Sequence, residues 1–155
     1  MNERGRLELQ LGHLCNNRCV FCVSGKLTHE RRAPLLAAEP LLATLRDAHA
    51  RGARSVTLLG GEPTIQPVFL HVVREAVRLG FDEIVVFSNG SAPSRTQIID
   101  RVLATGGHFE WRFSFQGGTR EAHEATTRRR GSFAQLLRSV DRARARDQRV
   151  TVNLC

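Results

Sequence analysis

Aromatic residues and lysine are scarce in this chain of 155 residues. Tyrosine is absent, aromatic side chains make up 6% of the sequence, and Lys26 is the only lysine among 23 basic residues. The formal net charge of +8 rests on arginines that are scattered, apart from a cluster at 128–130 and a run at 142–149. Because base stacking on aromatic side chains contributes much of the affinity for single-stranded nucleic acid, nucleic-acid binding is not expected as the main function.

Long apolar runs are absent as well. No stretch approaches the ~20 residues that a helix needs to cross a bilayer, and residues 1–6 are polar and charged rather than of the signal-peptide type. We therefore expect a cytoplasmic protein without membrane association. In that reducing compartment the four cysteines are expected to be metal ligands or free thiols rather than disulfides.

The remaining composition is that of an ordinary globular protein, with 41% hydrophobic and 25% charged residues. The chain is long enough for one domain with a core, but it is short for a complete eight-stranded barrel of about 250 residues. No low-complexity linker divides it. We therefore expect a single, incomplete domain over residues 1–155.

Strand and helix patterns alternate along the chain. Strands are predicted at 7–11, 55–59, 84–87, 109–115 and 150–154, and helices at 35–51, 68–79, 93–104 and 132–147, with Ser132 as the cap of the last helix. A longer basic loop is predicted before that helix. Alternating βα units form parallel sheets, so the predicted fold is α/β, a partial parallel (βα) barrel of about five strands.

Unusual polar and glycine-rich clusters follow each predicted strand. Because the carboxyl ends of parallel strands carry the functional sites of such folds, we expect these clusters to meet at one rim. They are the cysteine cluster, Gly60-Gly61-Glu62-Pro63, Ser88-Asn89-Gly90, Ser114-Phe115-Gln116-Gly117 and Asn153. Gly60-Gly61 and Asn89-Gly90 are also common turn sequences, so each pair alone carries little weight.

Cys15, Cys19 and Cys22 form a C-x3-C-x2-C motif. Three cysteines at this spacing can bind three irons of a [4Fe-4S] cluster, whereas ferredoxins supply a fourth cysteine. No fourth cysteine is near, because the remaining one is Cys155, interpreted as a free thiol. One iron would then stay open, which is typical of catalytic metal centres. The alternative is a Cys3His zinc site completed by His13 or His29.

These motifs resemble the radical S-adenosylmethionine (radical SAM) superfamily. The C-x3-C-x2-C motif, with Phe21 before its last cysteine, is similar to that family's cluster motif, and residues 60–63 match its GGEP motif. Residues 88–90 are similar to its TNG motif with serine for threonine, and residues 114–117 occupy the place of its S-x-D/H-G motif. The resemblance covers essentially the whole chain.

The resemblance implies an enzyme that binds a [4Fe-4S] cluster and S-adenosylmethionine (SAM). Such an enzyme cleaves SAM reductively to a 5′-deoxyadenosyl radical, which abstracts hydrogen from a substrate that the sequence does not identify, a peptide or a small molecule. It also implies an electron donor such as flavodoxin or ferredoxin. In this scheme Cys15, Cys19 and Cys22 are the metal ligands and catalytic residues.

The resemblance also implies the residues that contact SAM. They are Phe21, Gly60, Gly61, Glu62, Pro63, Ser88, Asn89, Ser114, Gln116 and Asn153. Glu62 would accept a hydrogen bond from the amino group of SAM, and the two glycines would let the backbone approach its methionine end. A bulky residue at position 61 is therefore expected to weaken SAM binding and to leave the cluster in place.

The chain departs from the family at its end, because members usually carry six strands and a C-terminal extension. We expect a gene fragment or a partner-dependent half-barrel whose fifth strand has an unpaired edge. The apolar side chains of that strand, Val150, Val152 and Leu154, are expected to pack inside a barrel wall. A non-catalytic module that binds the cluster and SAM is the alternative to an enzyme.

Overall fold

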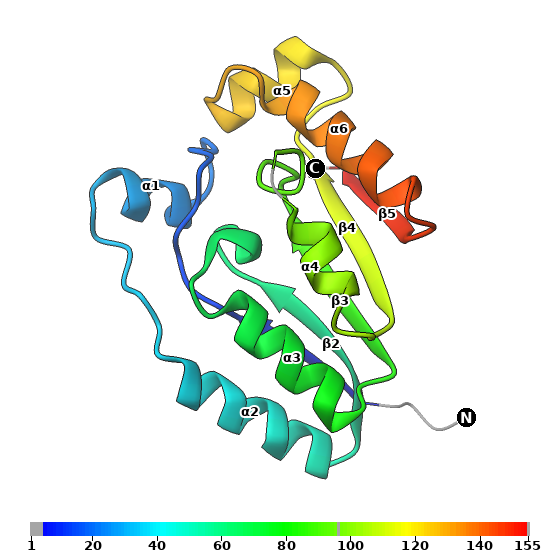
Figure 1. Cartoon of the computed structure of the whole chain (residues 1–155). Coiled ribbons are helices and arrows are strands. Elements are labelled where there is room, and N and C mark those ends of the chain that lie inside the picture. The colour runs from blue at the N-terminus through cyan, green and yellow to red at the C-terminus, as the bar shows by residue number, and fades with distance from the viewer. Residues whose placement is uncertain (1–4, 96, 155) are drawn as a thin grey trace.

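A computed structural model of the chain describes residues 5–95 and 97–154 (Figure 1). Five parallel strands form one sheet in the order β1-β2-β3-β4-β5, which is also their order in the sequence. They are β1 (Gly5–Gln10), β2 (Ala53–Leu59), β3 (Glu83–Ser88), β4 (Phe109–Phe115) and β5 (Arg149–Leu154). The predicted open, partial barrel is confirmed. Cys155, interpreted above as a free thiol, lies outside the described residues.

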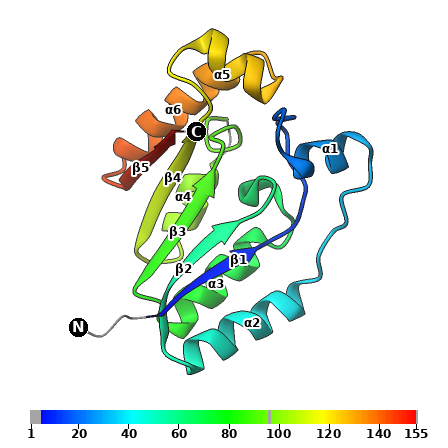
Figure 2. The ribbon, with the colours of Figure 1, turned by 180° about the vertical axis from the view of Figure 1, so that it is seen from behind.

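Helices cover one face of this sheet. They are α2 (Ala38–Ala50), α3 (Phe69–Leu79), α4 (Ile98–Leu103) and α6 (Ser132–Arg144). Figure 1 views the sheet from the side of these helices, and Figure 2 views it from the opposite side. Two further helices, α1 (Val23–His29) and α5 (Arg120–Thr127), lie at the carboxyl end of the sheet, and a 3-10 turn η1 (Pro63–Ile65) follows β2. No described helix is long and apolar enough to cross a membrane.

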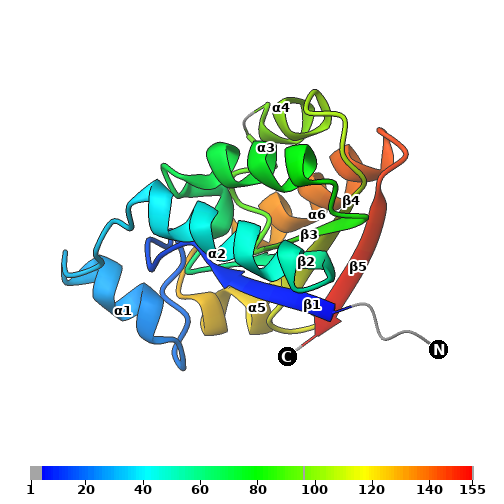
Figure 3. The same ribbon diagram turned by 90° about the horizontal axis from the view of Figure 1, so that it is seen from below.

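The two faces of the sheet differ in polarity. Residues paired in register point to the same side, and the row of Leu9, Leu58, Val86 and Trp111 is buried against the helices. The adjacent row is Glu8, Thr57, Val85, Glu110 and Arg149, and it faces the side without helices. Figure 3 views the curved sheet from below, with β1 and β5 at its two edges. This alternation gives the sheet an apolar outer face and a polar inner face.

The apolar face of β5 turns toward the helices rather than the barrel interior. Val150 is in register with Trp111, Val152 with Phe113, and Leu154 with Phe115. Val150 packs against the core, whereas Val152 and Leu154 remain 52% and 67% exposed. The register with β4 places all three side chains on the helix-covered face of the wall, where Val150 packs and the other two stay exposed.

The segment predicted as a long basic loop contains helix α5. Its helix begins after Thr119, whose hydroxyl accepts a hydrogen bond from the Ala122 N–H at 3.2 Å. This helix shows no apolar periodicity in the sequence, because its buried face consists of the polar residues His123 and Thr127. The prediction of Ser132 as a cap is also wrong. Gly131 occupies that position with φ +81°, and the buried Ser132 hydroxyl lies 2.8 Å from that of Thr127.

Two further helix boundaries differ from the prediction. The helix expected over 93–104 is confined to Ile98–Leu103. Helix α1 was not predicted, since it follows Cys22 directly and its sequence VSGKLTH carries only a short apolar pattern.

Substitution of both Val152 and Leu154 by lysine is expected to reduce self-association of the chain. In the described structure β5 pairs only with β4, so its outer edge combines free backbone groups with exposed apolar side chains. Light scattering over a concentration series should show larger species for the wild type than for the double variant. Leu35→Lys, at a residue 64% exposed, is the control. A wild-type chain that stays monomeric at all concentrations would contradict the prediction.

Candidate functional site

A cavity of about 320 Å³ opens at the carboxyl ends of β1 to β4. It gathers the cysteine motif, the glycine pair after β2 and the polar residues after β3 and β4. The lining residues are Gln10, Cys15, Asn17, Cys19, Phe21, Cys22, Leu59, Gly60, Gly61, Phe87, Ser88, Asn89, Ser114 and Gln116. The structure thus brings most of the predicted site residues to one rim; this cavity is called the inner pocket below.

Backbone hydrogen bonds hold the cysteine loop, residues 12–22, from two sides. On the sheet side, the Gly61 N–H donates to the Gly12 carbonyl at 2.8 Å and the Glu62 N–H donates to the Leu14 carbonyl at 2.7 Å. On the other side, the N–H groups of Arg18 and Val20 donate to carbonyls at the end of α5, at 2.9 and 3.0 Å. The protein itself therefore fixes the path of the loop that carries the three thiols.

Two glycines permit this close packing. A Cβ atom at Gly61 would lie 2.3 Å from the Leu14 carbonyl oxygen and 2.5 Å from that of His13. A Cβ atom at Gly25 on α1 would lie 2.8 Å from the Asn17 carbonyl oxygen. The steric need for glycine at position 61 therefore comes from the cysteine loop. This differs from the expectation that a larger residue there would disturb SAM and spare the cluster site.

Polar side chains connect the loop after β3 to the cysteine loop. The Asn89 side-chain amide donates to Asn16 Oδ1 at 2.9 Å and lies 3.7 Å from Cys15 Sγ. The Asn16 amide donates to the Ser91 hydroxyl at 2.6 Å, and Arg129 donates to the same hydroxyl at 2.7 Å. Asn89 was predicted as a site residue, whereas Asn16, Ser91 and Arg129 were missed because their partners lie in distant segments.

Glu62 occupies a fully buried position beneath the rim. Its carboxylate accepts hydrogen bonds from the N–H and hydroxyl of Thr64, the hydroxyl of Ser88 at 2.8 Å and the N–H of Asn89 at 2.7 Å. Burial raises the pKa of the Glu62 carboxyl, and these hydrogen bonds act in the opposite direction. The carboxylate thus joins the loop after β2 to the loop after β3.

Three predicted residues do not line the inner pocket, namely Glu62, Pro63 and Asn153. Pro63 is buried and begins the turn η1, a position that suits its fixed φ. Asn153 is in register with Ser114 and shares its side of the sheet. The side chain of Gln66 was missed, although it donates to the Leu14 carbonyl at 2.7 Å and further fixes the cysteine loop.

A buried oxygen without a protein partner marks the β4 side of the inner pocket. Gln116 Oε1 is buried and accepts no hydrogen bond within the described structure. Buried polar atoms are normally hydrogen bonded, so a donor group of a bound ligand would satisfy this oxygen. The Gln116 N–H donates to His123 Nδ1 at 3.1 Å. Helix α5 thus brings the His123 ring against this loop.

The thiols of the motif must lose their protons before they can bind iron or zinc. Burial raises the pKa of the Cys15 thiol to about 12, so a bound metal must displace its proton. Among the described residues, no three Cys, His, Asp or Glu side chains are gathered around one metal position. A four-iron cluster makes a different demand, because each cysteine binds its own iron. His13, considered as a zinc ligand, is hydrogen bonded through Nδ1 to the Ser24 hydroxyl at 3.0 Å.

The family assignment follows from comparison with known proteins. The model of the "Radical SAM superfamily" matches residues 9–155. The chain belongs to this superfamily. The matched residues include the complete cysteine motif and all the strand ends that form the inner pocket, so the resemblance drawn from the sequence is confirmed.

The curated relatives are longer than this chain. A GTP 3′,8-cyclase from Marinobacter nauticus is 28% identical over 138 residues, which cover 89% of this chain and 41% of that enzyme. A probable GTP 3′,8-cyclase from Saccharolobus solfataricus is 35% identical over 85 residues, covering 54% of this chain and 27% of that protein. The chain thus spans less than half the length of these relatives.

Solved structures support the fold assignment. SuiB from Streptococcus suis superposes with a TM-score of 0.75 and 18% identity, over 96% of this chain and 32% of SuiB. SuiB bound to S-adenosylmethionine gives a TM-score of 0.54, with 14% identity over 96% of this chain and 38% of that one. The methyltransferase TsrM from Kitasatospora setae, with cobalamin and a [4Fe-4S] cluster bound, gives 0.66, with 15% identity over 97% of this chain and 31% of TsrM.

Proposed function

We propose that Cys15, Cys19 and Cys22 hold a [4Fe-4S] cluster and that SAM binds beside it in the inner pocket. One observation carries this proposal: the three thiols and the strand-end residues of β2, β3 and β4 line one cavity. The described residues include no fourth cysteine that could bind the remaining iron. The bound cluster would supply the electron that cleaves SAM to methionine and a 5′-deoxyadenosyl radical.

The residues of the chain have distinct tasks in this proposal. The Asn89 amide lies 3.7 Å from Cys15 Sγ and can donate to the thiolate, which stabilises negative charge on the sulfur. Gln116 Oε1 offers an acceptor to a hydroxyl or amino group of SAM. Ser114 and the backbone at Gly60 form the neighbouring wall of the pocket. Glu62 acts from beneath, by holding the loops after β2 and β3 together.

The proposed reaction is hydrogen abstraction from a substrate that these residues do not identify. The printed activities of similar proteins differ, since they include a GTP 3′,8-cyclase and SuiB, which has been solved with its precursor peptide SuiA. A nucleotide and a peptide are therefore both represented among relatives of this fold. The exposed apolar residues of β5 favour a second form of the proposal, in which a partner completes the half-barrel.

Anaerobic reconstitution tests the proposal directly. The wild-type chain should bind about four irons and show an EPR signal after reduction. SAM should change that signal, because one iron has no cysteine ligand. Cys19→Ala should lose most of the bound iron, whereas an alanine at Cys155, outside the motif, should retain it. Stoichiometric zinc in place of iron, or an EPR signal that SAM leaves unchanged, would contradict the proposal.

A further inference from the structure

Arg129 lies in the turn between α5 and α6 and reaches the cysteine loop from the opposite end of the chain. Its Nη1 atom donates hydrogen bonds to the Ser91 hydroxyl at 2.7 Å and to Asn17 Oδ1 at 3.4 Å. The Ser91 hydroxyl also accepts a hydrogen bond from the side-chain amide of Asn16 at 2.6 Å. Because Asn16 and Asn17 directly follow Cys15 in the sequence, these bonds fix the guanidinium beside the first cysteine of the motif.

The guanidinium of Arg129 is half-buried and has no acidic partner. Its Nε and Nη2 atoms make no hydrogen bond to another described residue, and no described carboxylate forms an ion pair with it. Burial lowers the pKa of this guanidinium and Arg95 adds to the effect, whereas the Cys15 thiolate acts in the opposite direction. A partly buried charge is costly without a counter-charge, so this position favours negative charge at the cysteines.

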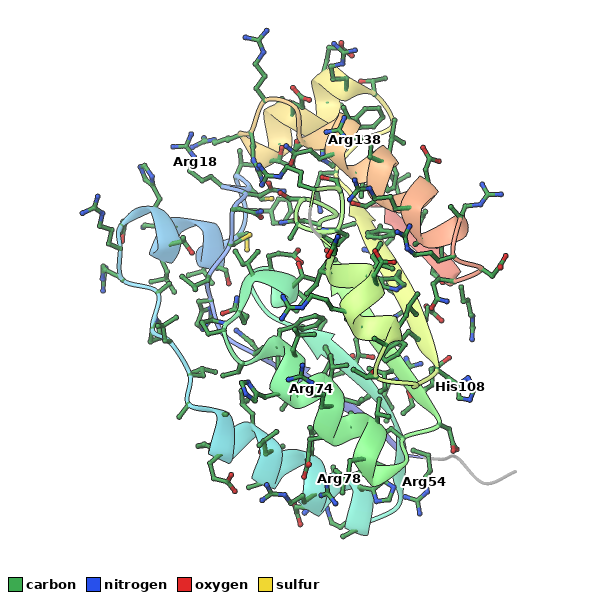
Figure 4. The ribbon with its side chains drawn as sticks, in the orientation of Figure 1. Arg18, Arg54, Arg74, Arg78, His108 and Arg138 are labelled. Atoms are coloured by element: carbon green, nitrogen blue, oxygen red, sulfur yellow. The ribbon has the colours of Figure 1, made fainter. Side chains whose placement is uncertain are left out.

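The neighbouring arginines differ from Arg129 in their exposure. Arg18, within the motif, is exposed and points away from the sheet (Figure 4). Arg128 and Arg130, which flank Arg129 in the sequence, are exposed as well. Water and salt screen an exposed charge strongly, whereas a half-buried charge keeps more of its strength. Among these four arginines, Arg129 therefore has the strongest influence on charge at the cysteines.

We propose that Arg129 raises the reduction potential of the cluster held by the cysteine motif. This inference rests on the proposed function. An oxidised [4Fe-4S]²⁺ cluster with three thiolates has one net negative charge, and the electron that converts it to [4Fe-4S]⁺ adds a second. A fixed positive charge stabilises the reduced form more than the oxidised form, so this one-electron step becomes easier. Arg129 is thus a positioning residue, which holds a charge beside the cluster and does not contact the substrate.

A redox titration of the reconstituted full chain, carried out without SAM and followed by EPR, tests this inference. Dithionite supplies one electron to each cluster. In Arg129→Gln, the ratio of reduced to oxidised cluster at a fixed solution potential should fall at least about tenfold, which corresponds to about 59 mV for one electron. Arg129→Lys keeps the positive charge and should stay within about threefold of the wild type. Arg130→Gln, with the same charge change at an exposed neighbour, should match the wild type.

The outcomes separate this inference from the proposed function. A wild-type chain that binds no iron contradicts the proposed function itself. If the wild type is loaded and Arg129→Gln has an unchanged potential, Arg129 does not tune the cluster and the proposed function stands. A potential that falls equally in the glutamine and lysine variants would show that hydrogen bonding rather than charge is responsible. A change that appears only after SAM is added would assign Arg129 to SAM, and either result overturns the inference.

Incomplete loading of the glutamine variant does not prevent the measurement, because a midpoint potential is independent of the fraction of chains that hold a cluster. If Arg129→Gln binds no iron at all while Arg130→Gln is fully loaded, Arg129 serves to assemble the cysteine loop. That result would also overturn the inference and leave the proposed function standing.

Discussion

Replacing Gly61 by valine is expected to prevent most cluster loading and to destabilise the apo-protein. The new side chain would begin 2.3 Å from the Leu14 carbonyl oxygen, so either the loop after β2 or the cysteine loop must move. Such a movement breaks the hydrogen bonds from Gly61 and Glu62 to the cysteine loop. The cost of overpacking and of two lost hydrogen bonds is roughly 3 kcal/mol in the free energy of unfolding.

Iron content after reconstitution and urea unfolding of the apo-protein measure the two effects. Gly118→Val is the matched control, since a Cβ atom there meets no atom within 4 Å. That variant should load iron and unfold like the wild type. If Gly61→Val binds a full complement of iron and loses only its response to SAM, the glycine serves the ligand rather than the cysteine loop.

Replacing Glu62 by alanine is expected to lower the free energy of unfolding by about 3 kcal/mol or more. The change leaves donors of Thr64, Ser88 and Asn89 without their acceptor in a buried position. It also releases the loop that carries Asn89, so iron binding should weaken. An exposed ion pair contributes much less, because water already solvates both charges.

Glu39→Ala provides the control for this second substitution. Glu39 is 72% exposed and pairs with Arg46 at 2.8 Å on the surface, so its loss should change the unfolding free energy by under about 1 kcal/mol. Urea unfolding of the apo-proteins compares both variants with the wild type. A Glu62→Ala protein as stable as the wild type, but unresponsive to SAM, would instead support the direct contact with SAM that the sequence motif implied.

The sequence alone determined the class of fold and the place of the site. The alternation of strand and helix patterns predicted five parallel strands, and residues such as Cys15, Ser88 and Ser114 fell at strand ends. Both inferences depend on local patterns, because strand periodicity and the position of a residue at a strand end are properties of one segment. Parallel pairing then brings those ends to a common edge without further information.

The roles of individual side chains required the tertiary structure. The sequence could not place the Gly61 Cα against the Leu14 carbonyl or the Glu62 carboxylate beneath Ser88, because these contacts join segments that only the packing of the loops brings together. Helix α5 was not predicted, because its buried face is polar. The hydrogen bond from the Gln116 N–H to His123 depends on that helix and was therefore not predicted either. A second, basic cavity beside the cysteine loop also depends on packing. Its residues Lys26 and Arg128 are far apart in the sequence, and they line one cavity only because α1 and α5 fold beside that loop.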